Sequence, residues 1–326
     1  MAEPATLVSP FLRRGPARRG MMLGMLACLS VTALHFAGRY DPAFALRYAA
    51  GLALAGLIET VYALLQDGRW VWPRASTLVT AALLLLSVPA RMPAAEAAAG
   101  ILVAVSFGKL TVDPRALRLN PMLMGRLFLM LVFADSIQRW APPAARVDAL
   151  STATPLGLFA AEGAVYSPWR IARGAIGGDW NGLYALVPGA PGEVMPLLAA
   201  GCGAALYLAG VLDWRPAAAY LAGFAGVCAL LGMPVAFHVA AGSTVFTAVY
   251  IVTDPRSMPA SKFGRWAAGL LAGVSNALLR RQGYYPEGVV WAVLAANLLT
   301  PALDRLAFIG RGWRLRRASA RAGKRP

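Results

Sequence analysis

One short run near the middle of the chain gathers side chains that could do chemistry. It reads Asp148-Ala149-Leu150-Ser151-Thr152-Ala153-Thr154-Pro155. A reachable hydroxyl such as that of Thr154 can act as a nucleophile, and small neighbours allow a modifying enzyme to close over it. The same residues also describe the start of a helix, with Thr154 as the N-cap and Pro155 at the first helical position. Residue types alone leave both interpretations open.

The composition around this run is that of an integral membrane protein. Of the 326 residues, 58% are hydrophobic and 14% are charged, and the mean hydropathy is +0.57. A soluble domain of this length is usually far less apolar. The net charge of +16 comes from arginines at both termini and in short connections, where they orient membrane spans. No basic helix or aromatic-basic platform is present, so we expect the lipid bilayer and no nucleic acid as a partner.

Uninterrupted apolar stretches of about 17 to 25 residues predict ten membrane spans. They cover residues 21–38, 43–65, 75–90, 93–110, 120–138, 193–212, 216–232, 234–252, 264–281 and 287–308. The third and fourth ranges are short and rich in alanine, so nine spans is the alternative. The expected fold class is an all-α integral membrane protein of about ten transmembrane helices.

The spans divide the chain into five parts. These are a cytoplasmic N-terminal segment (1–20), a first transmembrane half (21–138), an outward-facing loop (139–192), a second transmembrane half (193–308) and a basic cytoplasmic tail (309–326). Ten spans place both ends on one side, and the arginine bias makes that side the cytoplasm. Five spans on either side of the loop are compatible with two halves related as inverted repeats.

The residues that usually bind metals have no suitable pattern. Cys28, Cys202 and Cys228 lie within apolar runs and form no CxxC pair, which is typical of small buried hydrophobic residues. His35 and His238 are the only histidines, and each lies in an apolar stretch. We therefore expect no metal site, and we interpret His238 as a packed or hydrogen-bonded residue.

Several charged residues lie inside or beside the spans. A charge at mid-membrane costs several kcal/mol, so Glu59 in the second span must be paired, protonated or in contact with a wet path. We favour a structural hydrogen bond for it. Arg126 could partner an acid from another span. The acids near span ends are interpreted as caps or interface charges, and they are Asp135, Glu193, Asp213, Asp254 and Asp304.

Four segments, in order, resemble a known membrane protein family. They are Asn120–Gly125, Asp148–Leu156, Gly189–Met195, and a long stretch from His238 through Thr253-Asp254-Pro255-Arg256-Ser257 and Gly283-Tyr284-Tyr285-Pro286-Glu287-Gly288 to Asp304. In this order they are similar to the family that contains the D subunit of the Rnf electron-transport complex and the B subunit of the sodium-pumping NADH:quinone oxidoreductase. The ordered set is far more specific than any one of its members.

The resemblance implies a covalently bound cofactor. In that family a flavin transferase joins FMN through its phosphate to a threonine, and the matching position is Thr154. Asp148, Ser151, Thr152 and Ala153 would surround the attachment point. Thr152 stands where the family has glycine, and its β-branched side chain restricts the backbone there. The resemblance also leaves room for a non-covalent flavin such as riboflavin, to which no residue is assigned.

The expected function follows from this resemblance. The chain would be a subunit of an Rnf-type complex in a bacterial inner membrane, with its flavin loop on the periplasmic side. It would relay electrons to other subunits, coupled to translocation of Na⁺ or H⁺. We expect no catalytic residue and no complete reaction from the chain alone, because it has no nicotinamide fingerprint and no cysteine set for an iron–sulfur cluster.

Two alternatives remain open at this stage. Ten spans with a central division also fit a urea- or ammonium-channel-like transporter. A flavin-free structural subunit of a redox complex would keep the fold without the cofactor. The coupling ion, the electron donor and the electron acceptor are not specified by the residues.

Overall fold

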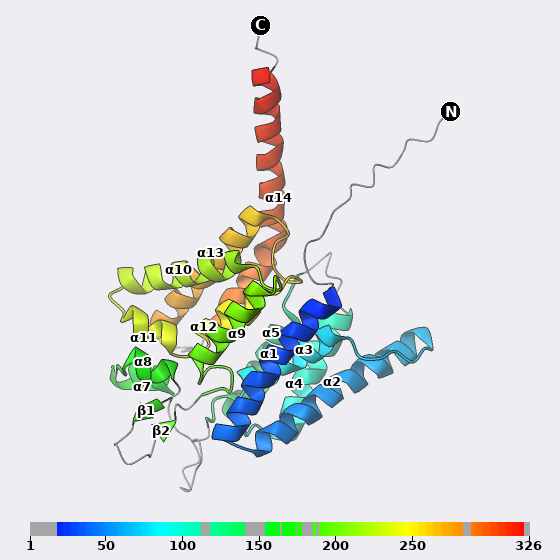
Figure 1. The fold of residues 1–326 in the computed structure, drawn as a ribbon, viewed down its shortest axis with the longest axis vertical. Coiled ribbons are helices and arrows are strands. Elements are labelled where there is room, and N and C mark those ends of the chain that lie inside the picture. The colour runs from blue at the N-terminus through cyan, green and yellow to red at the C-terminus, as the bar shows by residue number, and fades with distance from the viewer. Residues whose placement is uncertain are drawn as a thin grey trace.

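The computed structural model describes residues 18–111, 118–140, 154–163, 165–173, 175–177, 185–186, 189–282 and 288–322. Helices dominate these residues, and the described strands form one two-stranded ribbon. Figure 1 shows the helices packed side by side in one body, from which the end of the last helix projects.

The first part of the chain folds into consecutive helices joined by short connections. They are α1 (Arg18–Arg39), α2 (Ala43–Asp67), α3 (Ala75–Ser87), α4 (Ala94–Val105), the π-helix η1 (Ser106–Thr111), α5 (Pro121–Val132) and α6 (Ala134–Ile137). Helix α3 is buried along most of its length, and it contacts α1, α2, α4 and α5. It is therefore the centre of this part.

The second part has the same helical character but more breaks. It comprises α9 (Pro196–Leu208), α10 (Trp214–Leu230), α11 (Val235–Ala240), α12 (Thr244–Phe246), the π-helix η2 (Thr247–Ile251), α13 (Lys262–Arg281) and α14 (Val289–Ala322). Helix α13 packs between α10 and α14. Contacts of α1 with α9 and of α5 with α14 join the second part to the first.

The connection between the two parts carries small elements of its own. They are α7 (Pro155–Glu162), α8 (Pro168–Ala172), and the strands β1 (Ala175–Gly177) and β2 (Ala185–Leu186), which pair antiparallel. In Figure 1 these elements cover the lower side of the helical body, whereas α1 begins on its upper side and α14 ends at the top.

Three helical segments among the described residues are long and apolar enough to cross a membrane. They are Arg19–Arg39, Ala43–Asp67 and Val289–Ile309. Shorter apolar helices include α3, α5 and α9. These helices support the prediction of a helical integral membrane protein.

The predicted ranges coincide with helix in the structure, but two of them are interrupted. The range 234–252 is split into α11, α12 and η2, with Gly242 in the left-handed region at a φ of +68°. The range 120–138 is divided at Phe133, where α5 ends and α6 begins. Non-helical backbone at membrane depth is tolerated where protein surrounds it, and Ala241 and Ser243 beside the first break are fully buried.

Polar N-caps explain where several helices begin. Asn120 accepts a hydrogen bond from the backbone N–H of Met122 at 3.0 Å, and Ser261 accepts one from Gly264 at 3.0 Å. Such caps satisfy backbone donors that have no partner within the helix. The interpretation of Glu59 as a structural hydrogen-bonding residue is confirmed, because its Oε2 accepts the backbone N–H of Arg74 at 2.8 Å, where α3 starts.

Candidate functional site

Thr154 is the residue immediately before α7, and its side chain caps that helix. The Thr154 hydroxyl oxygen accepts a hydrogen bond from the backbone N–H of Gly157 at 3.1 Å, and Pro155 occupies the first helical position. The predicted helix start at Thr154 is therefore confirmed. The other predicted site residues, Asp148, Ser151, Thr152 and Ala153, lie outside the described residues.

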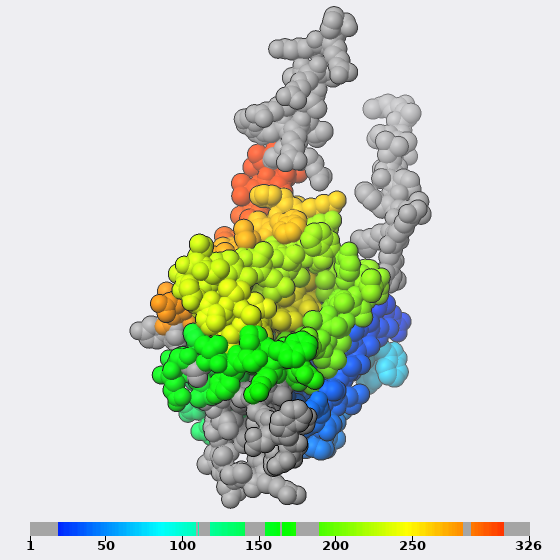
Figure 2. Space-filling model, turned by 60° about the vertical axis from the view of Figure 1, so that its left-hand side comes forward, coloured from blue at the N-terminus to red at the C-terminus, as the bar shows by residue number. Residues whose placement is uncertain are grey.

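Helix α7 is anchored to the helical body by apolar contacts. The Leu156 side chain is only 3% exposed, and it packs with Ile171 of α8 and Phe237 of α11. The ring of Phe159 lies 5.5 Å from that of Phe237. Figure 2 shows α7 and α8, in green, directly against α11, in yellow. Thr154 thus lies at the start of a surface helix with a fixed inner face.

The break in the eighth predicted span makes room for this anchor. A Cβ atom on Gly242 would lie 2.5 Å from Cδ1 of Leu156, so a side chain there would push the Leu156 side chain out of its present position. The positive φ of Gly242 is also a conformation that L-residues with side chains rarely adopt. Gly242 therefore serves both the turn of the chain and the close approach of α7.

Arg280, near the end of α13, holds the broken segment in place. Its guanidinium donates to the carbonyl oxygens of His238 at 2.7 Å and Ala241 at 3.3 Å, and to the hydroxyl of Thr244 at 3.0 Å. Its charged group also lies 4.9 Å from the centre of the Phe224 ring. The side chain is almost fully buried. Arg280 therefore takes the place of the hydrogen bonds that a continuous helix would have made.

The sequence interpretation did not give Arg280 this role. Any arginine near the C-terminus of a helix interacts favourably with the helix dipole. Residue type alone therefore did not distinguish Arg280 from Arg281. In the structure Arg281 is exposed, whereas Arg280 is buried because it binds carbonyl groups at the end of α11.

His238 is a packed residue, as expected. Its side chain is fully buried, and its ring lies edge-on to Phe159 at 4.7 Å and to Phe237 at 5.1 Å. Neither ring nitrogen has a hydrogen-bond partner among the described residues. The same part of the chain contains no group of three or more potential metal ligands.

The position of Thr154 is compatible with a phosphate ester. The backbone N–H groups of a first helical turn and the helix dipole both stabilise negative charge at a helix N-terminus. Thr154 is only half-buried, so its hydroxyl is not sealed in the protein. In the cap bond to Gly157 the hydroxyl oxygen is the acceptor, so this contact does not use the O–H group.

A buried ion pair lies where the connection leads into α9. Arg126 of α5 and Glu193 are 3% and 5% exposed, and Nη2 of Arg126 lies 3.6 Å from Oε1 of Glu193. The prediction that Arg126 partners an acid of another segment is confirmed. Next to it, the backbone N–H of Gly192 donates to the carbonyl oxygen of Leu86 at 2.7 Å. These contacts tie the end of the connection to α3 and α5.

Of the acids interpreted as caps or interface charges, Asp213, Asp254 and Asp304 accept backbone N–H groups. The interpretation is wrong for Glu193, which is buried in its ion pair with Arg126. Asp304 accepts the backbone N–H groups of Ala260 at 3.1 Å and Ser261 at 3.0 Å before α13, and Arg118 at 2.9 Å. Asp254 accepts the backbone N–H of Arg256 at 3.2 Å, which stabilises the turn there. Asp304 and Asp254 thus stabilise the loop segments that precede and follow these backbone groups.

Asp213 caps α10 and has the strongest charge partners of this group. It accepts the backbone N–H of Arg215 at 3.0 Å and forms an ion pair with Arg265. Burial raises the pKa of the Asp213 carboxyl, but these hydrogen bonds and the two positive charges outweigh burial and bring the pKa below its ordinary value.

The sequence of this chain is similar to those of a known protein family. The family model described as "NQR2, RnfD, RnfE family" matches residues 5–308. The B subunit of the Na(+)-translocating NADH-quinone reductase of Klebsiella pneumoniae (strain 342) is 31% identical over 244 residues, which are 70% of this chain and 58% of the relative. The corresponding protein of Neisseria meningitidis serogroup A (strain Z2491) is 32% identical over 240 residues, 69% of this chain and 58% of the relative.

A relative from another complex also matches. The D subunit of the proton-translocating ferredoxin:NAD(+) oxidoreductase complex of Clostridium ljungdahlii is 28% identical over 240 residues, which are 71% of this chain and 72% of the relative. The chain spans less than two thirds of the length of the two NADH-quinone reductase proteins named above.

Proposed function

Because this chain belongs to the NQR2, RnfD, RnfE family, we propose that it is a membrane subunit of an Rnf-type ion-translocating electron-transport complex, with FMN esterified to Thr154. The proposal is supported by relatives that are named as subunits of a Na(+)-translocating NADH-quinone reductase and of a proton-translocating ferredoxin:NAD(+) oxidoreductase complex. The single observation that supports the attachment site is that the Thr154 hydroxyl lies half-buried at the N-terminus of a surface helix.

The chain's own residues would position the cofactor. Leu156 and Phe159 fix α7 against α11, and Arg280 fixes α11 against α13. The N-terminus of α7 would stabilise the phosphate charge. When bound, FMN supplies the capacity to accept electrons and pass them on. A cofactor on a helix that is held in this way would keep a constant distance to its redox partners.

We propose a ten-span arrangement with the flavin loop on the periplasmic side of a bacterial inner membrane. Each predicted span contains helix among the described residues, although two are interrupted, and α7 lies on the side of the body opposite to the start of α1 and the end of α14 (Figure 1). With both termini in the cytoplasm, as the arginine distribution predicts, α7 would face outward. The two halves would be inverted repeats of five spans each.

The proposed partners are the other subunits of the complex and a flavin transferase. Electron transfer through the flavin would be coupled to translocation of Na⁺ or H⁺, the two ions named in the relatives. Glu193 and Arg126 are not proposed as ion ligands, since their mutual contact accounts for their burial.

A flavin-free structural subunit is the second candidate, and one observation favours it. The Thr154 hydroxyl already has a structural role as the cap of α7, which would be sufficient reason for a threonine at this position. An experiment must therefore separate capping from attachment.

Three substitutions at Thr154 make this separation. Thr154→Asn retains a capping side chain but lacks the hydroxyl, Thr154→Val lacks both, and Thr154→Ser retains both. The full chain would be co-expressed with a flavin transferase, and in-gel flavin fluorescence of the denatured protein would be measured. We expect fluorescence in the wild type and in Thr154→Ser, and none in Thr154→Asn or Thr154→Val.

Each result has a distinct meaning. Fluorescence in Thr154→Asn equal to that of the wild type would move the attachment site to another residue. No fluorescence in the wild type would favour the flavin-free subunit. Thr154→Asn should unfold at nearly the same temperature as the wild type, whereas Thr154→Val should lose about 1 kcal/mol of stability because the cap is missing.

A further inference from the structure

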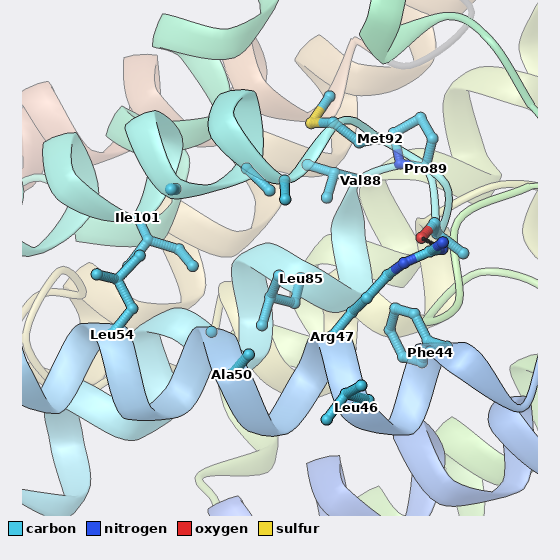
Figure 3. Close-up of a pocket in the computed structure, with 15 residues that line it drawn as sticks. Phe44, Leu46, Arg47, Ala50, Leu54, Leu85, Val88, Pro89, Met92 and Ile101 are labelled. Atoms are coloured by element: carbon cyan, nitrogen blue, oxygen red, sulfur yellow. Dashed lines mark hydrogen bonds between the residues drawn. The ribbon is translucent and has the colours of Figure 1, made fainter.

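A groove of about 320 Å³ opens on the surface of the first half, between α2, α3 and α4. One face of α2 supplies its floor, with Arg47, Ala50, Gly51 and Leu54 at helical spacing. The end of α3 and the first turns of α4 supply its walls. Figure 3 shows Leu54 and Ile101 at one end of this groove and Arg47 at the other.

The lining of the groove is almost entirely apolar. Besides Arg47, its side chains are those of alanine, leucine, isoleucine, valine, proline, methionine and phenylalanine, with one glycine. From Arg47 to Leu54 the floor extends for roughly 10 Å, at 1.5 Å per helical residue. These dimensions suit a single stretch of hydrocarbon chain.

Two arginines lie at one end of the groove: Arg47 lines it, and Arg91 stands in the chain between the lining residues Ala90 and Met92. Nη1 of Arg47 donates to the carbonyl oxygen of Ala90 at 2.8 Å and lies 3.4 Å from Oδ2 of Asp41. Nε of Arg91 lies 3.6 Å from the same Asp41 oxygen. The two arginine side chains are 44% and 46% exposed, and that of Asp41 is 16% exposed. Two guanidinium groups thus share one carboxylate.

The surface of α2 around the groove is apolar and exposed, as expected for a helix that faces lipid. Helix α2 is one of the segments able to cross a membrane, and its leucines on the outer face include Leu46, 76% exposed, and Leu65, 82% exposed. Arg47 lies in the second turn of α2, where a long basic side chain extends to the level of the lipid headgroups. The charged end of the groove would then lie at headgroup depth and its apolar part in the acyl region.

We propose that this groove binds an anionic phospholipid, with one acyl chain along α2 and the phosphate at Arg47 and Arg91. Charge complementarity selects the occupant. A hydrophobic helix of another protein would fill the apolar part but would leave both arginines without an anionic partner beyond Asp41. The inference depends on the membrane location of α2 and is independent of the flavin proposed at Thr154.

Native mass spectrometry of the full chain, released from detergent, tests the proposal. Phosphatidylglycerol and phosphatidylcholine with identical acyl chains would be added in turn, and the retained lipid counted. We expect selective retention of phosphatidylglycerol. Each arginine removed, in Arg47→Gln and Arg91→Gln, should weaken this retention about fivefold, the factor that corresponds to about 1 kcal/mol per basic residue near a charged membrane surface.

Matched variants separate the groove from general effects. Ala50→Phe fills the groove and should reduce retention of phosphatidylglycerol, whereas Ala49→Phe, on an adjacent exposed residue that does not line the groove, should not. Arg39→Gln serves as the charge control at the exposed end of α1. Arg47→Lys preserves the charge and should retain the lipid, so the proposal stays testable if the glutamine variants fold poorly.

Two results would overturn the proposal. One is equal retention of the two lipids by the wild-type chain. The other is retention of phosphatidylglycerol in Ala50→Phe at the level of Ala49→Phe, since lipid bound elsewhere would not respond to the groove.

Discussion

Thr154 combines a capping bond with the proposed ester bond on one oxygen atom. The hydroxyl accepts from Gly157 at 3.1 Å, and an ester oxygen would be a weaker acceptor than a hydroxyl. In the modified protein the phosphate oxygens would be available to the same N–H groups, as anions generally are at helix N-termini. Attachment at a cap therefore exchanges one acceptor for another and leaves α7 intact.

Replacing Arg280 should destabilise α11, the segment against which α7 packs. In Arg280→Met the buried carbonyl oxygens of His238 and Ala241 lose their charged donor. The Thr244 hydroxyl, which donates to the His238 carbonyl at 3.1 Å, can satisfy only one of these two oxygens. At least one buried acceptor therefore loses a partner, which costs about 1–3 kcal/mol. We expect a lower unfolding temperature and faster proteolysis within the connection. Arg281→Met, on the exposed neighbour, is the control and should behave as the wild type; equal losses in both variants would contradict the role given to Arg280.

The lowered pKa of Asp213 should make the free energy of unfolding depend on pH. Because the folded-state pKa of Asp213 lies below its ordinary value, its contribution is present above the pKa of the unfolded chain and is lost as the pH falls through the folded-state pKa. As the pH is lowered from neutral into the acidic range, the unfolding temperature of the wild type should therefore fall more steeply than that of Asp213→Asn. Asp67→Asn, on an exposed residue at the end of α2, should retain the wild-type slope. Parallel slopes for wild type and Asp213→Asn would refute the prediction.

At the scale of elements, α10 and α13 approach so closely that their contact depends on glycine. A Cβ atom on Gly273 would overlap the carbonyl oxygen of Tyr220, and one on Gly269 would overlap that of Pro216. Small residues allow membrane helices to pack backbone against backbone. The position of Arg280, further along α13, depends on this contact.

The substitution Gly273→Ala tests the close approach. The added methyl group has backbone in its way, so we expect a loss of about 1–3 kcal/mol, as for other overpacked sites. Gly226→Ala on α10 is the matched control, because a Cβ there would meet nothing within 4 Å. It should be neutral or stabilising by about 0.5–1 kcal/mol, since alanine favours helix over glycine. The unfolding temperatures of the two variants should be compared. Equal values would show that α10 and α13 can move apart without loss of stability, against the prediction.

Helix positions could be predicted from the sequence because hydrophobic runs and caps are local signals. The caps at Thr154 and Asp213 were visible as residue types beside proline or an apolar run. The break at Gly242 was not predicted, because the run 234–252 contains no charged residue that would end a span. The acceptors freed there bind Arg280, which lies far away in the sequence. Glu59 was similar: its partner is the backbone N–H of Arg74, which no pattern of side chains reveals.

At the scale of the whole molecule, one buried ion pair links the two parts of the chain. Arg126 belongs to α5, and Glu193 precedes α9. The sequence indicated that Arg126 needed an acid, but several acids were available, and only the fold brings Glu193 within 3.6 Å. The candidate flavin residues are a harder case: four of the five lie outside the described residues, so their prediction depends on the family resemblance alone.

Breaking this pair should affect the whole protein. In Glu193→Gln the buried Arg126 keeps its charge without its counter-ion, which typically costs about 3–5 kcal/mol. The double variant Arg126→Met with Glu193→Leu should lose less than the sum of the single losses, because no isolated charge remains. Glu162→Gln, on an exposed residue of α7, is the control. Additive losses in thermal unfolding would contradict a direct interaction between the two side chains.

The proposed covalent bond between FMN and Thr154 would increase the mass of the chain, so the intact mass of the full chain tests it. The chain would be purified after co-expression with a flavin transferase, weighed, and digested to locate any added mass. The account predicts an FMN-sized increment on the peptide that contains Thr154, and no increment in Thr154→Asn. An unmodified wild-type chain, or an increment on a peptide without Thr154, would contradict it.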